Sequence, residues 1–221
     1  MNLDNIQKRM TSAFLERKQY TRAEKDGWTD FAYPKLIRLM RFHTERYRVE
    51  GFGHFMTMHT KTAFGMELLT ASFTPGEGVS VPYCLIDIMT VGKKRTVFVE
   101  YYDCTAEKKE MPKLAETAAK YADLADYAEK PKWYVGERTP YSLIKCGTAS
   151  DENLLEEMIF ASVDAYRAEV SEAGTDAGNT DGLKLFRDRM INEGNPSSSV
   201  LEKVFGKEGA AEFFRQCVMP I

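Results

Sequence analysis

The sequence has 221 residues, of which 43% are hydrophobic and 29% charged, with a formal net charge of −3. These values are those of an ordinary globular protein, which we expect to be a single domain over residues 1–221. No basic surplus indicates a nucleic-acid partner, and no apolar run approaches the roughly 20 residues that span a bilayer. The N-terminus lacks the apolar core of a signal peptide, and the four cysteines are scattered without a CxxC pair. Both features favour a cytoplasmic protein with reduced thiols.

Residues 1–46 are predicted to be mainly helical. Residues 6–26 are polar with spaced apolar positions, and residues 34–47 follow a proline that a first helical turn tolerates. Between Tyr47 and Thr105, β-branched and aromatic runs are interrupted by glycine and proline, as in strands joined by short turns. These runs predict an antiparallel meander, in which VGKKRT (residues 91–96) is the clearest hairpin turn.

Helical patterning returns in the second half of the chain. We expect a helix over residues 111–130, one or two strands within 133–147, and a helix over 150–174 that Ser150 caps. Residues 171–182 are predicted to be a loop, and further helices are expected over 183–194 and 199–221. Strands in the middle with helices on either side predict an α+β fold, in which helices cover an antiparallel sheet.

One strand carries an unusual carboxylate. In VPYCLIDIM, residues 81–89, strand alternation places Leu85, Asp87 and Met89 on one face and Ile86 and Ile88 on the other. A carboxylate is costly to bury unless it is paired or its pKa shifts. Asp87 is therefore either a polar residue near a sheet edge or a protonatable group that faces a pocket.

Other motifs are weaker. His54 and His59 are five residues apart with no carboxylate between them, so no metal site is predicted there. The sequence contains no GxGxxG, GxxxxGK[ST] or GxSxG motif. The cations Lys93, Lys94 and Arg95 form either a solvated turn or a docking site for an acidic partner.

Three stretches of the chain carry a family resemblance. They are GMELLTASFTP with VPYCLIDIMTVG, residues 65–92, then PKWYVGERTPYSLIKCGTASDEN, residues 131–153, and NPSSSVLEKVFGKEGAAEFFRQCVMPI, residues 195–221. Together they resemble the ferredoxin-dependent bilin reductases, a family that reduces biliverdin-type linear tetrapyrroles. The first looks like the family's paired strands with a proline-containing turn, the second is similar to its segment that leads into an acidic helix start, and the third is similar to its C-terminal helix.

The resemblance implies a three-layer α/β/α sandwich with a central antiparallel sheet, and a role for several residues. Asp87 falls on the family's catalytic aspartate, which donates protons to the bilin. Lys145 falls where the family has an arginine that pairs with a propionate, and Thr70 where some members have a histidine. No bound metal or other cofactor is implied, because an external ferredoxin or flavodoxin supplies the electrons.

The chain departs from the family near its C-terminus. Asn195 stands at the position of a second aspartate, and Pro196–Ser199 replace basic residues that contact the substrate, so Ser198 becomes a substrate-binding candidate. Two functions are therefore predicted. The first is a divergent oxidoreductase that reduces a linear tetrapyrrole with electrons from an acidic carrier protein, and the second is a non-catalytic haem or bilin binder.

Overall fold

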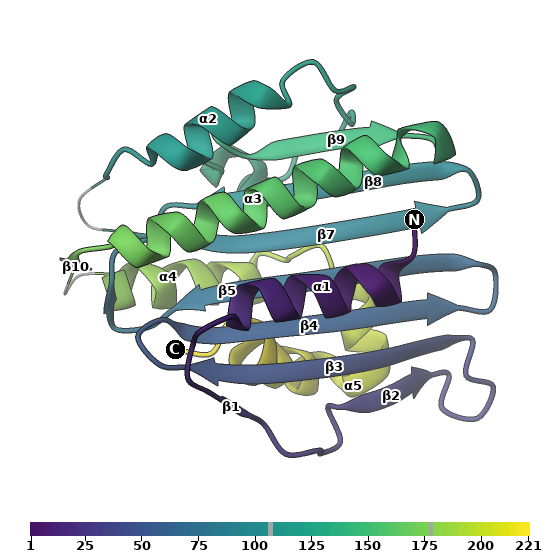
Figure 1. Ribbon diagram of the computed structural model, residues 1–221. Coiled ribbons are helices and arrows are strands. Elements are labelled where there is room, and N and C mark those ends of the chain that lie inside the picture. Colours follow the sequence, from purple (N-terminus) through teal and green to yellow (C-terminus); the bar gives the residue numbers. More distant parts are fainter. Residues whose placement is uncertain (106–107, 177–178) are drawn as a thin grey trace.

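The chain forms a large antiparallel sheet in the computed structural model, which describes residues 1–105, 108–176 and 179–221. Within these residues the sheet has eight strands in the order β1-β3-β4-β5-β7-β8-β9, and β2 also pairs with β3 (Figure 1). A separate pair joins β6 and β10.

The elements in chain order are α1 (Leu3–Leu15), β1 (Tyr20–Arg22), β2 (Asp30–Tyr33), β3 (Met40–Val49), β4 (Gly53–Thr62), β5 (Met66–Pro75), β6 (Gly78–Val79), β7 (Tyr83–Val91), β8 (Lys94–Tyr102), α2 (Pro112–Lys120), η1 (Trp133–Glu137), β9 (Leu143–Gly147), η2 (Ala149–Asp151), α3 (Glu152–Glu172), β10 (Thr175–Asp176), α4 (Asn179–Asn192), α5 (Ser198–Phe213) and η3 (Phe214–Val218).

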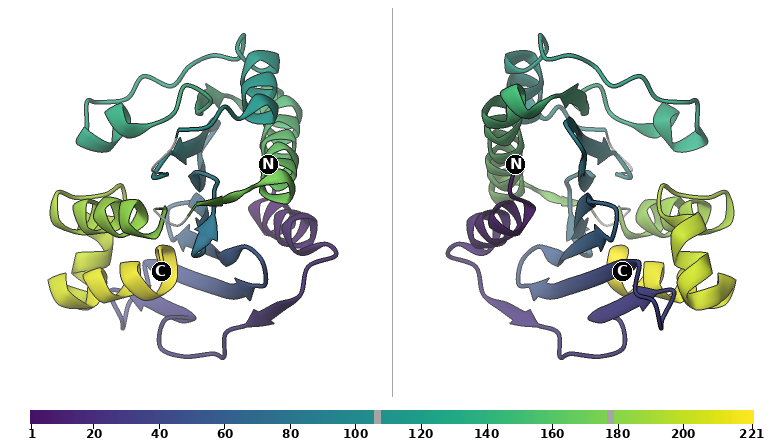
Figure 2. Two further views of the ribbon diagram at one scale, coloured as in Figure 1. Left: turned by 90° about the vertical axis from the view of Figure 1, so that its left-hand side faces the viewer. Right: turned by 90° about the vertical axis from the view of Figure 1, so that its right-hand side faces the viewer.

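Helices cover both faces of the sheet. Helices α1 and α3 pack against one face, with α2 beside α3, whereas α4 and α5 lie on the other face (Figure 2). The predicted α+β fold with three layers is therefore confirmed. No helix in the described ranges is long and apolar enough to cross a membrane.

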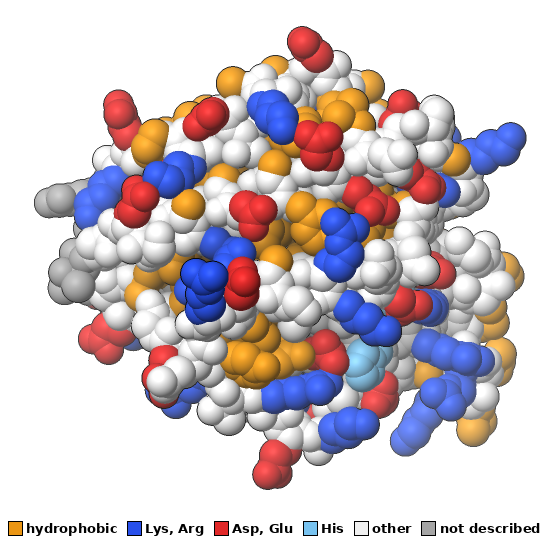
Figure 3. Space-filling model, viewed as in Figure 1, with side chains coloured by type: hydrophobic (Ala, Val, Ile, Leu, Met, Phe, Trp, Pro, Cys, Tyr) orange, Lys and Arg blue, Asp and Glu red, His pale blue; other side chains and the backbone are white. Residues whose placement is uncertain are grey.

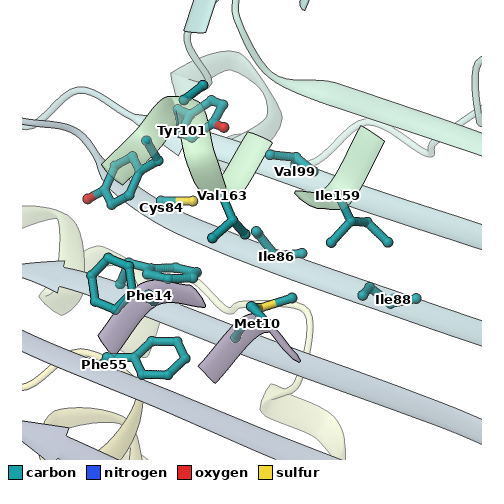
Figure 4. Packing of buried hydrophobic residues seen from close by; sticks show 14 of the residues in the cluster. Met10, Phe14, Phe55, Cys84, Ile86, Ile88, Val99, Tyr101, Ile159 and Val163 are labelled. Carbon is teal, nitrogen blue, oxygen red and sulfur yellow. The ribbon is translucent and has the colours of Figure 1, made fainter. Parts of the chain in front are cut away.

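Alternation along β7 separates two hydrophobic cores. Cys84, Ile86 and Ile88 point into the core beneath α1 and α3, which Figure 4 shows from close by. Tyr83 and Leu85 point into the core beneath α4 and α5. Successive side chains of a strand point to opposite faces, so Asp87 belongs to the α4–α5 side.

Phe14 of α1 is the centre of an aromatic group in the first core. Its ring lies 5.0 Å from Phe52, 5.1 Å from Phe55 and 4.8 Å from Phe73, measured between ring centroids. Edge-to-face and tilted packing at such distances adds to the free energy gained by burying the rings. These contacts fix α1 across the middle of the sheet.

The predicted meander is confirmed, and its β7–β8 hairpin is tight. Val91 pairs with Lys94, so β7 and β8 are joined by two residues, Gly92 and Lys93. Gly92 has a φ of 56°, which suits the first central position of a type II′ turn. The outer edge of β9 is covered, because Tyr127 donates a backbone hydrogen bond to Ile144.

Several local predictions were wrong. Residues 34–47 do not form a helix, because residues 40–49 pair along their whole length with β4 as β3. Helix α2 ends at Lys120, since the chain then turns to follow the edge of β9, and residues 133–137 form a 3₁₀ helix. The helix over 150–174 is confirmed as α3, but its entry is a capping box of Thr148 and Asp151.

The expected loop over residues 171–182 is also largely wrong. Helix α3 continues to Glu172, Thr175 and Asp176 form β10, and α4 already begins at Asn179. Residues 177 and 178 lie outside the described part of the chain. The two predicted C-terminal helices are present as α4 and α5, and α5 is kinked at Gly206, where φ is 73°.

Candidate functional site

Asp87 lies in the middle of the sheet, on the face that α4 and α5 cover. It stands opposite Thr70 of β5 and Phe98 of β8. The Thr70 hydroxyl donates a hydrogen bond of 2.5 Å to Oδ1 of Asp87. The carboxyl is partly buried among Met58, Tyr83 and Leu85, which are apolar or aromatic. Among the described residues no hydrogen bond reaches its second oxygen, Oδ2, so this atom is available to a ligand.

This surrounding raises the pKa of Asp87 to about 7. Desolvation is the largest cause, because the charged form loses its hydration among apolar neighbours. The Thr70 hydrogen bond acts in the opposite direction, and the negative charge of Glu100 raises the pKa further. A carboxyl with a pKa near 7 is able both to hold and to release a proton at neutral pH.

Glu100 is a second buried acid on the same face, and the sequence analysis missed it. It lies opposite Leu85, diagonally next to Asp87, and its side chain is 2% exposed. Tyr102 and Arg138 both donate hydrogen bonds to its Oε1, at 2.7 and 2.6 Å. Burial raises the pKa of Glu100, whereas the Arg138 charge lowers it. The ion pair makes Glu100 a fixed charge beside the site.

Tyr83 and Ser72 connect the sheet to the C-terminal segment. The Ser72 hydroxyl lies 3.0 Å from the Tyr83 hydroxyl, and it donates a hydrogen bond of 2.5 Å to the Val218 carbonyl. Both side chains are buried. The end of η3 is thereby held against β5, close to Asp87.

Two hollows lie side by side on the α4–α5 face and share three lining residues. The inner one is narrow, is lined by Thr70 and Asp87, and leaves only about 20 Å³ for water. The outer one is an open groove of about 730 Å³ along α5 and the end of α4. Asn195, Leu201 and Phe214 line both hollows and therefore form the partition between them.

Asn195 lines the same hollow as Asp87, and Ser198 lines the neighbouring groove. The polar atoms of both side chains form hydrogen bonds with nearby residues of the chain. The Asn195 side-chain amide donates to the Met190 carbonyl at 3.1 Å and its oxygen accepts from the Ser197 backbone at 3.0 Å. The Ser198 hydroxyl accepts from the Asn195 backbone at 2.7 Å. Asn195 faces both hollows, whereas Ser198 faces the outer groove.

Lys145 does not lie with the other candidates. It pairs with Val97 of β8, a residue of the first core, so its side chain lies on the opposite face from Asp87. Its ammonium group donates to the Ala122 and Leu124 carbonyls at 2.8 and 2.9 Å, and to Asp126 at 2.7 Å. All three of its hydrogens are used, so we leave Lys145 out of the site proposed below.

No metal centre is evident in the described ranges, where no three His, Cys, Asp or Glu side chains are placed to hold an ion. His59 is buried and lies between two carboxylates, with Asp4 at 2.9 Å and Glu67 at 3.0 Å. The cysteines at 84, 104, 146 and 217 are all free thiols.

The fold is that of the bilin reductases. The chain is similar to phytochromobilin synthase from tomato, solved in complex with biliverdin, with a TM-score of 0.79. The alignment covers 96% of this chain and 81% of that one, at 10% sequence identity. No family model and no curated protein matches the sequence. The resemblance predicted from the sequence is therefore confirmed at the level of the fold.

Proposed function

We propose that this chain is a divergent oxidoreductase that reduces a biliverdin-type linear tetrapyrrole. Electrons come from an external ferredoxin or flavodoxin, and at least one proton comes from Asp87. The observation that carries the proposal is a carboxyl with a pKa near 7 that lines the inner hollow on the α4–α5 face. The shared fold with a biliverdin-bound protein supports the choice of ligand.

The bilin is proposed to occupy the outer groove and to open the partition toward Asp87. The groove volume of about 730 Å³ lies within the roughly 300–1,000 Å³ typical of ligand pockets, whereas the inner void of about 20 Å³ holds one water at most. Contact with Asp87 therefore requires Asn195 and Leu201 to move. Both precede the kink at Gly206, where the helical backbone is already interrupted.

Two cations beside the groove are suited to propionates. Lys207 and Arg215 both line the groove, together with Glu202, Glu208 and Glu212, and Arg215 has only a distant ion pair, 3.8 Å from Glu212. Carboxylates bound by such side chains form charge-assisted hydrogen bonds. We propose that these two residues take the place of the basic residues missing from Pro196–Ser199, and that Ser198 and Asn195 contact the same ligand.

The proton chemistry is assigned to one oxygen of Asp87. Thr70 already donates to Oδ1, so the proton of the neutral carboxyl lies on Oδ2. Reduction of one double bond takes up two electrons, which the carrier delivers one at a time, and two protons. Asp87 supplies one proton, and water supplies the other and reprotonates Asp87. The negative charge of Glu100 lies diagonally next to Asp87, which favours the protonated form of Asp87 before the electrons arrive.

The second candidate is a non-catalytic bilin or haem binder. It is favoured by one observation, which is that Asn195 is an amide with no proton to transfer, and its side chain already forms two local hydrogen bonds. In that case Asp87 hydrogen-bonds to a pyrrole without giving up its proton.

Anaerobic addition of biliverdin separates the two candidates. We expect the visible bands of biliverdin to shift on binding and then to disappear when reduced ferredoxin is added. Asp87→Asn should bind biliverdin and stop or divert reduction, and Lys145→Met serves as a control that leaves both steps unchanged. A bound bilin that stays spectrally unchanged under reducing conditions would establish the binder instead. An absence of binding at micromolar concentration would refute both.

A further inference from the structure

Three hairpin turns at one end of the sheet carry apolar side chains that no described residue covers. This hairpin edge consists of residues 34–39, 61–67 and 91–95, which join β2 to β3, β4 to β5 and β7 to β8. The three segments are adjacent, because Ala63 donates a backbone hydrogen bond to Leu39 and Met66 pairs with Val91. At about 4.8 Å between strands, the edge is about 20 Å wide from β3 to β8.

The apolar exposure is concentrated at the tips of these turns. Leu36 is 95% exposed, Phe64 85%, Ile37 70% and Val91 44%. Single exposed apolar residues are ordinary, but adjacent ones rimmed by charge mark an interaction site. Figure 3 shows orange side chains together with blue ones at its right-hand side, where Figure 1 places the β4–β5 and β7–β8 hairpins.

The charge of the hairpin edge is opposite to that of the whole chain. Its three segments contain six cations and one acid, although the protein has a net charge of −3. Two of these cations are neutralised, since Lys61 pairs with Asp4 and Arg95 with Glu152. The others form no ion pair within the described part of the chain. They are Lys35, Arg38, Lys93 and Lys94.

The arginines at 38, 41, 46 and 48 do not form a second patch. Strand β3 sends Arg41 and Arg46 to opposite faces of the sheet. Arg46 is paired with Asp26 at 2.7 Å. Only Arg38 belongs to the exposed hairpin edge.

Strand β7 connects the hairpin edge to Asp87. Val91 follows Asp87 by four residues, which corresponds to about 14 Å along the strand. The edge is therefore the outer surface that lies at the end of the strand carrying the proposed proton donor.

We infer that the hairpin edge is the docking surface for a small acidic electron-carrier protein. This inference rests on the proposed function, which requires an external electron source. The carrier's carboxylates contact Lys35, Arg38, Lys93 and Lys94, and an apolar centre covers Phe64 and Leu36. Charge complementarity of this kind accelerates encounter and makes binding dependent on salt.

The test measures binding of oxidised [2Fe–2S] ferredoxin and of oxidised flavodoxin by isothermal titration calorimetry. The double variant Lys93→Glu/Lys94→Glu should weaken binding of the carrier about 10-fold or more at low salt. Phe64→Ser should weaken it about 5-fold and leave the salt dependence unchanged. The matched control is Lys130→Glu/Lys132→Glu, which makes the same charge change on exposed residues away from the hairpin edge and should change binding less than about 2-fold.

Two further measurements separate this inference from the proposed function. Biliverdin titration should give the same affinity for all of these variants, and reduction driven by a viologen mediator in place of the carrier should proceed normally in each. Failure of mediator-driven reduction in the unmodified protein would count against the proposed function alone. The docking inference is overturned if neither carrier binds, or if the hairpin-edge variants bind as well as the control. It is also overturned if the variants lose binding to phosphatidylserine vesicles while carrier binding is unaffected, because the surface would then serve a membrane.

Discussion

Replacement of Asp87 by asparagine should stabilise the protein at alkaline pH and have little effect in acid. The change keeps the size of the side chain and leaves an oxygen to accept the Thr70 hydrogen bond. It removes only the ability of the group to ionise. The difference in unfolding free energy between the variant and the parent therefore isolates the cost of the buried charge.

The magnitude follows from the pKa of about 7 against an ordinary value of 3.8. A folded-state pKa that is raised above the unfolded value means that stability is fully present below pH 3.8 and is lost as the pH rises to about 7. At about 1.4 kcal/mol per pH unit, the loss is about 4 kcal/mol at most. The carboxyl is partly exposed, so we expect Asp87→Asn to gain about 2–4 kcal/mol above pH 8.

Urea unfolding followed by circular dichroism, from about pH 4 to pH 8.5, measures this difference. The unfolding free energies of the two proteins should be nearly equal at about pH 4, and the difference between them should grow until about pH 7. Thr70→Val provides a matched control, because loss of the hydroxyl removes an interaction that lowers the pKa of Asp87. In a Thr70→Val background, the stabilising effect of Asp87→Asn should therefore continue to grow to a higher pH. A difference that does not vary with pH would refute the description of Asp87 as a carboxyl with a raised pKa.

Three other substitutions test the surroundings of the site by the same unfolding assay. Phe14→Ala removes the ring that contacts three other phenylalanines and should lower the unfolding free energy by about 3–5 kcal/mol; a loss below about 1 kcal/mol would contradict its central position. Lys145→Met should lower it by about 1–3 kcal/mol and leave biliverdin affinity unchanged, whereas a weakened affinity would return this residue to the site. Glu100→Gln should lower it by about 3–5 kcal/mol, because Arg138 loses its most buried partner. The same variant should move the Asp87 transition to lower pH, and an unmoved transition would show that the Glu100 charge does not act on Asp87.

The central strands could be predicted from the sequence because two independent signals agree there. Alternating apolar residues mark the strands, and glycine or proline marks the turns between them. Residues 34–47 lacked this agreement, since their charged and apolar side chains fit a helical period as well as an alternating one. Pairing with β4 decides the outcome, and no local pattern contains that information.

The site was predicted only in part, for a related reason. Asp87 is a candidate because it interrupts an apolar run, and Glu100 interrupts the run VFVEYY in the same way. Lys145 was misplaced because the face to which a side chain points depends on the register of its strand. A shift of one residue exchanges the two faces, and the sequence does not fix the register between β8 and β9.

The central claim is that a linear tetrapyrrole binds on the α4–α5 face and opens the partition above Asp87. Amide hydrogen exchange with and without biliverdin tests it most directly, because exchange reports local opening along the chain. The account predicts altered exchange over residues 190–215, with α1 and α3 unaffected on the opposite face. Unaltered exchange over residues 190–215 in the bilin-saturated protein, or a change confined to α1 and α3, would contradict it.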